Sequence, residues 1–402
     1  MQAGNDKIEA AATCGTRTQG DCWVEVRSAE PAQPQSGTIE LVGDLEAARQ
    51  STVRQVAQDI LAALGTPAAA ITIEDHGAAP FCLQARIETA VRRFVKDSFS
   101  GLESVPVPAA NCEKPRRSVI RSRLFVPGNT PKFMLKAGQC GADGILFDLE
   151  DAVAPAEKDA ARCLVRNALG ALSFHDAERA VRINPHPEGL EDARALAPHG
   201  VHTFVIPKVE GPEAVVAVEE AACRALSGAG AEAQIGLLPM IESARGVFRA
   251  LEIAEASPSV IGLFIGLEDY ARDIGAERLP DDREALWACS RVVAAARAAG
   301  GQPFGSVYTD LDNEDGLADF IRRCRALGFE GIACIHPRQV AVVHRILAPE
   351  AAEVETARRI VEAFERAAEA GGAVVTVDGQ MVDRPIVDRA HRTLERADEA
   401  HE

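Results

Sequence analysis

The sequence predicts an α/β protein built on a closed (β/α)8 barrel of the TIM type, with a small α+β domain before it and a helical extension with a hairpin after it. Three observations predict this fold. From residue 116 onward, eight short apolar runs alternate with helical stretches, and polar residues follow most of these runs. The chain also has 402 residues, more than the roughly 250 to 300 at which single cores stop growing.

The eight runs have the length and composition of buried parallel strands. The predicted strands are 122–126, 144–148, 180–183, 203–206, 235–240, 260–265, 303–307 and 331–335. Eight strand-helix units fit a closed barrel, and an open doubly wound sheet is the alternative.

The N-terminal part has a different pattern. Strands are expected at 21–27, 38–42 and 71–74, with apolar-periodic helices at 44–64 and 81–96. We therefore assign residues 1–97 to a small α+β domain. Residues 98–115 contain three prolines and no periodicity, which is typical of a linker. The barrel is expected at 116–345 and the extension at 346–402.

Composition excludes several classes of protein. Lys and Arg total 43 against 60 Asp and Glu, a formal charge of -17, which disfavours a nucleic-acid or anionic-membrane partner. No apolar run approaches the ~18 residues of a membrane helix, and the first residues lack a signal-peptide pattern. The ten cysteines form no C-x-x-C pair or zinc spacing. We expect a cytoplasmic protein with reduced thiols.

Polar residues gather after the predicted strands, where a barrel places its active site. Buried charges at one end of a sheet are costly unless they are paired or hold a ligand or metal. In chain order these residues are Asp148, Glu150, Asp151, Arg182, Asn184, Lys208, Glu242, Glu268, Asp269, Asp310 and His336.

Glu242 and Asp269 follow neighbouring predicted strands. Two carboxylates so placed can give Mg2+ its protein oxygens and leave its other positions to water and substrate. Pairing with Arg245 or Arg272 is the alternative.

Arg182, at the end of the third strand, could bind a substrate carboxylate through a bidentate fork. An internal salt bridge to Asp148 or Glu150 is the alternative. The acidic cluster of Asp148, Glu150 and Asp151 holds many like charges. We predict that its members position the metal ligands and Arg182. Direct binding of the metal by these residues is the less favoured role.

Two further strand ends carry candidate substrate-binding groups. Gly128 and Asn129 follow the first strand, and their backbone N–H groups could receive a phosphate with Arg121 and Arg123 nearby, or form an ordinary loop. Lys208 is a candidate cation after the fourth strand.

His336, after the eighth strand, could contact ligand or cap the next helix. Near the C-terminus, a predicted helix at 353–370 leads into a short hairpin with an Asp-Gly turn and a last helix. Such a hairpin is unstable alone and must pack on something. Asp383, at its end, is a candidate catalytic residue carried into an active site, its own or a neighbouring subunit's. A helix N-cap ahead of Pro385 is the alternative.

Residues 117–396 resemble the citrate lyase β-subunit family, which includes malyl-CoA and citramalyl-CoA lyases and belongs with the HpcH/HpaI aldolases. The resemblance runs through RSRLFVPGN, GADGILFDLEDAVAPAEK, VRINP, IPKVE, IESARG, GLEDY, CIHPRQV and DGQMVDRP. It implies a barrel, Mg2+ dependence and a homotrimer or hexamer. It implies that Glu242 and Asp269 bind the magnesium and Arg182 the substrate carboxylate. It further implies that Asp383 is a catalytic aspartate donated across a subunit interface.

The N-terminal domain resembles the citrate lyase acyl carrier (γ) subunit, through CGTRTQGDCWVEVR, IEDHGA and FCLQARIETAVRR. In that subunit a serine carries a CoA-derived prosthetic group. Gln19 occupies the corresponding position here, and an amide has no hydroxyl to form the phosphodiester. Thr18 is one residue away, where the attachment geometry would shift.

We therefore expect a Mg2+-dependent carbon-carbon lyase that cleaves a 3-hydroxy-3-carboxyacyl thioester of the citramalyl-CoA or malyl-CoA type into an α-keto acid and acetyl-CoA. A citrate lyase β subunit acting on a citryl-carrier thioester is the first alternative. A catalytically idle scaffold is the second, which retention of the candidate site residues opposes.

Overall fold

The computed structural model describes residues 11–28, 38–66, 69–96, 105, 119–230, 234–369 and 373–401. The predicted linker lies outside these residues except for Val105, which is buried. Within the described ranges, no helix combines the length and the apolar character that crossing a membrane requires.

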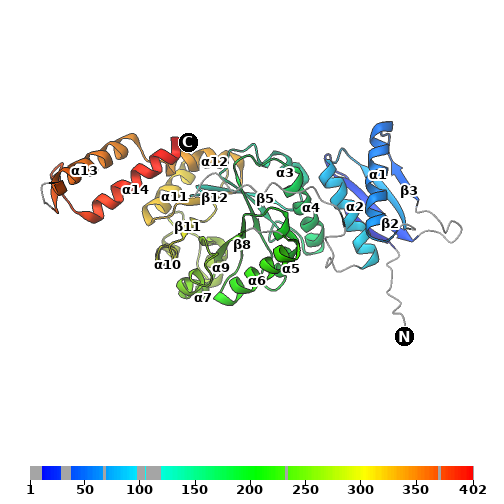
Figure 1. The fold of residues 1–402 in the computed structure, drawn as a ribbon, viewed down its shortest axis with the longest axis horizontal. Helices are drawn as coiled ribbons and strands as arrows, with labels where there is room; N and C mark the ends of the chain where they lie inside the picture. The colour runs from blue at the N-terminus through cyan, green and yellow to red at the C-terminus, as the bar shows by residue number, and fades with distance from the viewer. Residues whose placement is uncertain are drawn as a thin grey trace.

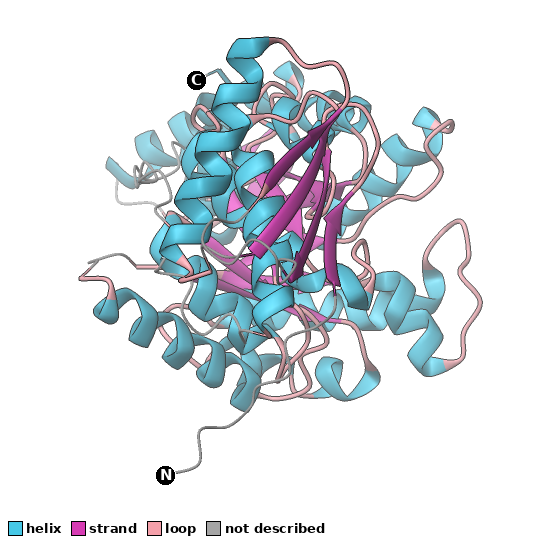
Figure 2. Cartoon of the chain, turned by 90° about the vertical axis from the view of Figure 1, so that its right-hand side faces the viewer, coloured by secondary structure: helices cyan, strands magenta, loops and turns pink. Residues whose placement is uncertain are grey.

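The N-terminal domain is a four-stranded sheet with two helices. Its elements are β1 (Ala11–Gly15), β2 (Cys22–Ser28), β3 (Ile39–Val42), α1 (Ala47–Ala63), β4 (Ala69–Asp75) and α2 (Pro80–Val95). The strand order is β1-β2-β4-β3, and only the β3–β4 pair is parallel. Alternate residues of β2 and β4, such as Val24 and Ile73, are buried against the helices, as a one-sided sheet requires. Figure 2 views the chain from the side of this domain.

The barrel closes through eight parallel strands. They are β5 (Ser122–Pro127), β6 (Gly144–Asp148), β7 (Glu178–Arg182), β8 (Thr203–Ile206), β9 (Gly236–Ile241), β10 (Gly262–Ile265), β11 (Gln302–Gly305) and β12 (Gly331–Cys334). The last strand pairs with the first through Ile332 and Ser122, so the open-sheet alternative is wrong. The predicted strands match these within three residues at each end.

Helices surround the strands as a ring (Figure 1). They are α3 (Pro131–Ala137), α4 (Lys158–Ala171), α5 (Gly189–Leu196), α6 (Pro212–Gly228), α7 (Ala244–Phe248), α8 (Ala250–Ala254), α9 (Leu267–Ile274), α10 (Leu286–Ala298), α11 (Glu314–Leu327) and α12 (Pro337–Leu347). A separate apolar cluster fills the barrel interior, including Leu146, Val205 and Phe264. The interior is therefore packed, and ligands can enter only at the strand ends.

Below this cluster, Arg123 and Glu178 form a buried ion pair, with Nε and Oε2 2.6 Å apart. Arg121 is bound to Asp143, with Nε and Oδ2 2.8 Å apart. Both pairs lie at the strand starts, so the expectation that Arg121 and Arg123 lie near the Gly128 loop is wrong. Each strand residue advances the chain by about 3.3 Å, so the start and the end of a strand lie at opposite ends of the barrel.

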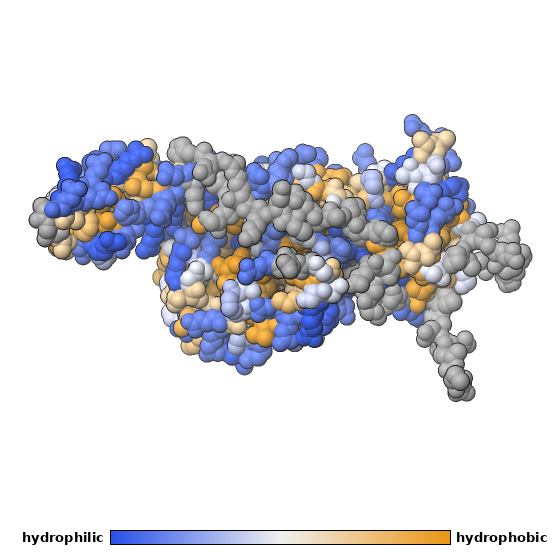
Figure 3. Space-filling view, in the orientation of Figure 1, coloured by the Kyte–Doolittle hydropathy of each residue, from blue (hydrophilic) through white to orange (hydrophobic). Residues whose placement is uncertain are grey.

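The C-terminal extension is an arm formed by α13 (Ala351–Glu369), β13 (Val375–Val377), β14 (Gln380–Val382) and α14 (Arg384–His401). It projects on the side opposite the N-terminal domain (Figure 1), and the face of the arm seen in Figure 3 is largely hydrophilic. The arm has an apolar cluster of its own, in which Val361 packs with Val382 and Val387. The hairpin thus packs on the two helices, as predicted.

Candidate active site

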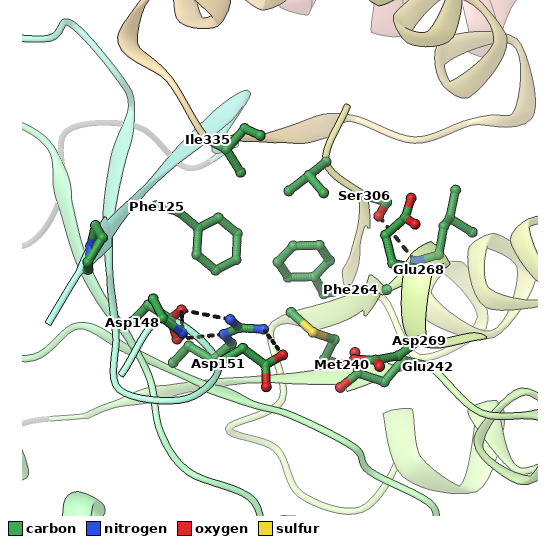
Figure 4. Close-up of a pocket in the computed structure, with 16 residues that line it drawn as sticks. Phe125, Asp148, Asp151, Met240, Glu242, Phe264, Glu268, Asp269, Ser306 and Ile335 are labelled. Carbon is green, nitrogen blue, oxygen red and sulfur yellow. Dashed lines mark hydrogen bonds and ion pairs between the residues drawn. The ribbon is translucent and has the colours of Figure 1, made fainter. Parts of the chain in front are cut away.

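A cavity of about 460 Å³ opens at the C-terminal ends of the barrel strands (Figure 4). Its polar lining residues are Asp148, Asp151, Arg182, Glu242, Glu268, Asp269 and Ser306. Residues that are far apart in the sequence meet here because every strand of the barrel ends on the same rim.

Glu242 directly follows β9 and is 5% exposed. Its Oε1 accepts a 2.6 Å hydrogen bond from the backbone N–H of Lys208. Burial raises the pKa of Glu242 to about 8, with a smaller contribution from the negative charges of Asp269 and Glu150. The group therefore favours its protonated form until a cation replaces the proton.

The carboxylate of Glu242 needs a glycine beside it. A Cβ added to Gly266 would lie 2.5 Å from Oε2 of Glu242, although the φ of Gly266, −101°, suits any residue. The Glu242 carboxylate thus fills the space between β9 and the start of α9 that a side chain at residue 266 would otherwise occupy.

Asp269 lies in the first turn of α9, and its carboxylate lies beside that of Glu242 in the cavity (Figure 4). Arg272 Nη2 is 2.6 Å from Asp269 Oδ1, but the Arg272 side chain is 74% exposed. Such an exposed pair is weak. Arg245 instead lies 3.5 Å from Glu210. The pairing alternative thus applies in part to Asp269 and does not apply to Glu242.

This pair fits Mg2+, which usually takes one or two carboxylates together with water and substrate oxygens. Within the described residues, no three His, Cys, Asp or Glu side chains form a metal-binding group. The donor set is therefore that of an open, substrate-completed site, since a closed structural site would need further ligands.

Arg182 is the last residue of β7. It forms internal salt bridges to Asp148 and Glu150, the predicted alternative to binding a substrate carboxylate. Its Nε and Nη2 bind the two oxygens of Asp148 at 2.8 and 2.7 Å, and Nη1 lies 2.8 Å from Glu150 Oε2. The guanidinium stacks over Phe125 at 5.0 Å. Arginine has five N–H donors. The fork is thus held rigidly while donors remain for a ligand in the cavity.

The electrostatics keep this arginine charged. Burial lowers the pKa of Arg182, but the hydrogen bond and charge of Asp148 outweigh burial and raise it above the usual value. A permanently cationic group here suits a carboxylate ligand.

Lys208 connects the acidic cluster to Glu242. Its φ of 52° is left-handed, a strained conformation for a residue other than glycine. This backbone points its N–H at Glu242, while its Nζ forms a very short ion pair with Glu150. Burial raises the pKa of Glu150 above its usual value, although Arg182 and Lys208 lower it.

A second cavity of about 800 Å³ adjoins the first. The two share Asp151, and the second runs between the loops after β6 and β7, past Ala156, Asp159 and Lys208. A ligand longer than the first cavity therefore has room along these loops.

At Gly128, the loop after β5 takes the ordinary-loop alternative to phosphate binding. The N–H of Gly128 donates to the Asp148 carbonyl at 2.8 Å, and the N–H of Thr130 donates to the Pro127 carbonyl at 3.2 Å. A Cβ on Gly128 would lie 2.7 Å from the Asp148 carbonyl. Gly128 thus packs the loop against β6. The Oδ1 of Asn129 accepts a hydrogen bond from the Thr130 hydroxyl at 3.0 Å, and neither Gly128 nor Asn129 is among the lining residues of the two cavities.

The remaining predicted residues lie apart from the cavity. His336 caps α12, with Nδ1 accepting from the N–H of Arg338 at 3.2 Å. Asp310 is exposed. Asp383 follows β14 in the arm, and no described residue of the arm lines the cavity.

Sequence reasoning missed the apolar lining of the cavity and its serine. Phe125, Met240 and Phe264 form a hydrophobic floor, and Ser306 Oγ accepts from the N–H of Leu267 at 3.1 Å. The position of Ser306, directly after β11, is the same signal that identified the charged residues. The apolar residues carry no such signal because barrel strands are apolar throughout.

Comparison with known proteins gives matches to both domains. Residues 121–337 match the HpcH/HpaI aldolase/citrate lyase family. Residues 9–94 match an acyl carrier family described as malonate decarboxylase delta subunit (MdcD).

Among curated relatives, the citrate lyase subunit beta of Escherichia coli K12 is 40% identical over 293 residues, which cover 72% of this chain and 97% of the relative. The mitochondrial citramalyl-CoA lyase of Rattus norvegicus is 32% identical and covers 70% of this chain and 85% of its own. The (3S)-malyl-CoA thioesterase of Cereibacter sphaeroides is 34% identical, and the match covers 69% of this chain and 94% of the relative.

Among solved structures, protein CitE from Mycobacterium tuberculosis in complex with magnesium, acetoacetate and coenzyme A is similar, with a TM-score of 0.59 and 30% identity. The match covers 70% of this chain and 99% of that one.

Proposed function

Because the chain belongs to the HpcH/HpaI aldolase/citrate lyase family, we propose that it is a Mg2+-dependent carbon-carbon lyase that cleaves a 3-hydroxy-3-carboxyacyl thioester into an α-keto acid and an acetyl thioester. The single observation that carries this proposal is the pair of Glu242 and Asp269 in one cavity, with the rigid fork of Arg182 on the same rim. Structures of the related CitE with magnesium and coenzyme A support it.

Glu242 and Asp269 would hold the metal. Bound there, Mg2+ supplies a Lewis acid that acidifies the substrate hydroxyl and stabilises negative charge on the oxygen of the keto acid. Arg182 binds the adjacent carboxylate with the N–H groups that Asp148 and Glu150 leave free. The substrate is thereby oriented before any bond breaks.

The reaction is a retro-Claisen cleavage. The hydroxyl gives its proton to solvent, its carbon-oxygen single bond becomes the carbonyl of the keto acid, and the electron pair of the breaking carbon-carbon bond passes to the acetyl thioester as an enolate. That enolate needs an acid to protonate its carbon, and Asp383 is the proposed donor. Asp148 supports this work by fixing Arg182, and Glu150 and Asp151 by holding Lys208. We assign Lys208 and Asn129 to substrate contact.

Asp383 is not among the residues that line the cavity of its own chain. It directly precedes α14, which returns to the barrel at Arg396, bound to Glu330 beside the start of β12. Thirteen helical residues span about 20 Å, and the start of β12 lies at the end of the barrel opposite the cavity. We propose that another copy supplies this aspartate, in a homotrimer or hexamer.

We favour a free CoA thioester, citramalyl-CoA or malyl-CoA, because Gln19 has no hydroxyl to carry a prosthetic group. A citryl-carrier substrate is the second candidate, favoured by the 40% identity to citrate lyase subunit beta. The same 402-residue architecture serves either, since both substrates present a hydroxyl, a carboxylate and a thioester.

Product analysis tests the proposal. The full chain with Mg2+ is offered citramalyl-CoA, malyl-CoA and citryl-CoA, and the products are identified by mass spectrometry. Pyruvate, glyoxylate or oxaloacetate released together with acetyl-CoA is the expected result. Hydroxy acid released with free CoA would indicate thioester hydrolysis instead, and no turnover of any substrate would favour the scaffold.

A further inference from the structure

The N-terminal domain is held against the barrel by charges that have no access to solvent. Glu88 and Arg92 of α2 and Arg166 of α4 are all 0% exposed. Arg166 Nη1 and Nη2 bind the two oxygens of Glu88 at 3.1 and 2.5 Å, and Arg92 Nε adds a contact of 2.9 Å. The two helices lie side by side between the domain and the barrel (Figure 1).

Separating the domains would break the ion pair between Glu88 and Arg166. It would also expose buried apolar surface to water, which costs about 25 cal/mol per Å². Asn167 of α4 also donates to the Phe81 carbonyl of α2 at 3.2 Å. The buried apolar residues of the two domains form one continuous core. The domain is therefore fixed in place, unlike a carrier that swings on a linker.

From this position, Arg93 of α2 reaches the loop that follows β6. It donates to the Ala156 carbonyl at 2.8 Å and binds Asp159 with two nitrogens at 2.5 and 2.7 Å. Ala156, in the loop after Asp148, and Asp159, in the first turn of α4, both line the second cavity. An arginine of the N-terminal domain thus holds one wall of the second cavity.

Arg86 of α2 reaches the neighbouring loop. Its Nε and Nη2 bind Asp21 at 3.0 Å each, and Nη2 also donates to the Asn129 carbonyl at 3.1 Å. Gly128, next to Asn129, donates its N–H to the Asp148 carbonyl. Arg86 and Arg93 therefore hold the two loops that meet at Asp148, the residue that fixes Arg182.

We propose that the N-terminal domain acts as a fixed brace of the active site, with Arg86 and Arg93 as positioning residues for binding of the substrate thioester. The effect on substrate binding rests on the proposed function, whereas the effect on the loops does not. The brace gives an acyl-carrier-like domain a task that needs no attached group at Gln19.

Two variants remove contacts to the loops and are designed to leave the fold of the domain intact. Arg93→Met removes the contacts to Ala156 and Asp159 from a side chain that is 20% exposed. Arg86→Lys keeps a cation for Asp21 but lacks the second fork arm that reaches Asn129. Arg17→Met is the matched control. Arg17 is 55% exposed, and among the described residues its ion pair lies inside the N-terminal domain, with Glu74 at 2.8 Å.

Hydrogen-deuterium exchange of the full-length chain reports on residues 127–130 and 149–157, and steady-state kinetics report on the thioester that the wild type cleaves. We expect faster exchange in 149–157 for Arg93→Met and in 127–130 for Arg86→Lys, with KM raised about tenfold and kcat changed much less. Arg17→Met should match the wild type. A third variant, Arg93→Lys, should exchange more slowly in 149–157 than Arg93→Met does, because the lysine places a cation beside Asp159 again.

Unchanged exchange of both loops in both variants would overturn the brace, whatever the enzyme activity. Wild-type protein that cleaves no thioester would overturn the proposed function alone, because the exchange measurement requires no turnover. Faster exchange with an unchanged KM would overturn the positioning role of the two arginines.

Discussion

The backbone N–H of Lys208 donates a 2.6 Å hydrogen bond to Oε1 of Glu242, from a left-handed conformation with φ of 52°. The Nζ of the same residue is paired with Glu150. One strained residue thus links the proposed metal ligand to the acidic cluster behind Arg182. Strain of this kind persists only where the surrounding structure imposes it, and it clusters at functional sites.

Replacing Lys208 tests this link. Lys208→Gly keeps the N–H to Glu242 and relieves the left-handed strain, so Mg2+ affinity should stay close to that of the wild type. Loss of the ammonium leaves Glu150 and Asp151 with less compensation, and kcat/KM should fall about 10- to 100-fold. Calorimetric Mg2+ titration and steady-state kinetics measure the two effects. The exposed Lys136→Met is the control. Equal kcat/KM in Lys208→Gly and the wild type would contradict the role of the ammonium.

Gly266→Ala should disable the metal site without unfolding the barrel. The new Cβ would lie 2.5 Å from Oε2 of Glu242 and displace that carboxylate, while the backbone conformation suits alanine. We expect at least a tenfold loss of Mg2+ affinity in calorimetry, with a circular dichroism spectrum like that of the wild type. Gly228→Ala, where an added Cβ meets nothing within 4 Å, is the control. Undiminished Mg2+ binding would show that Glu242 is not a ligand.

Burial raises the pKa of Glu242 from its ordinary value of 4.5 to about 8, and this predicts how Mg2+ stabilises the fold at different pH. Since the folded state holds this proton more tightly than the unfolded state, the metal-free protein should lose stability as pH rises from about 4.5 through about 8. Mg2+ compensates the charge, so its effect on Tm should be larger at pH 8.5 than at pH 6. Glu242→Gln mimics the protonated group and should show no such Mg2+ effect at either pH, as scanning calorimetry can verify. A Tm increase that is independent of pH in the wild type would refute this assignment.

Complementation between inactive variants tests donation of Asp383 by another copy. Asp383→Asn removes the proposed acid, and Asp269→Asn removes a proposed metal ligand. Each variant should be inactive alone, yet chains unfolded and refolded together should regain activity, because mixed oligomers contain some sites with both residues intact. Doubling the concentration of either variant alone is the control. Mixtures that stay inactive while mass spectrometry shows mixed oligomers would mean that Asp383 acts within its own chain or not at all.

Much of this architecture could be predicted from the sequence, since the barrel strands are short, apolar and evenly separated by amphipathic helices. Strand β1 was missed because Ala11–Gly15 is an edge strand with only Ala12 and Cys14 buried. The convergence of Glu242 and Asp269 could also be predicted, because barrel strands end at one rim.

Other features had no local signal. Glu88 and Arg92 are four residues apart on a helix, a spacing that is typical of an exposed pair, yet both are fully buried between the domains. Nothing in the letters around Lys208 indicates a left-handed backbone. Both features arise from contacts between segments more than 30 residues apart. Glu88 contacts Arg166, and Lys208 contacts Glu242.

The most direct test of the central claim is a titration of chelator-treated protein with Mg2+ while α-keto acid release is followed from the thioester that the wild type cleaves. We expect no release without metal, a saturable rise with Mg2+ in the wild type, and no rise in Asp269→Asn at any Mg2+ concentration. Release that proceeds equally well in the presence of chelator, or in Asp269→Asn, would contradict this claim.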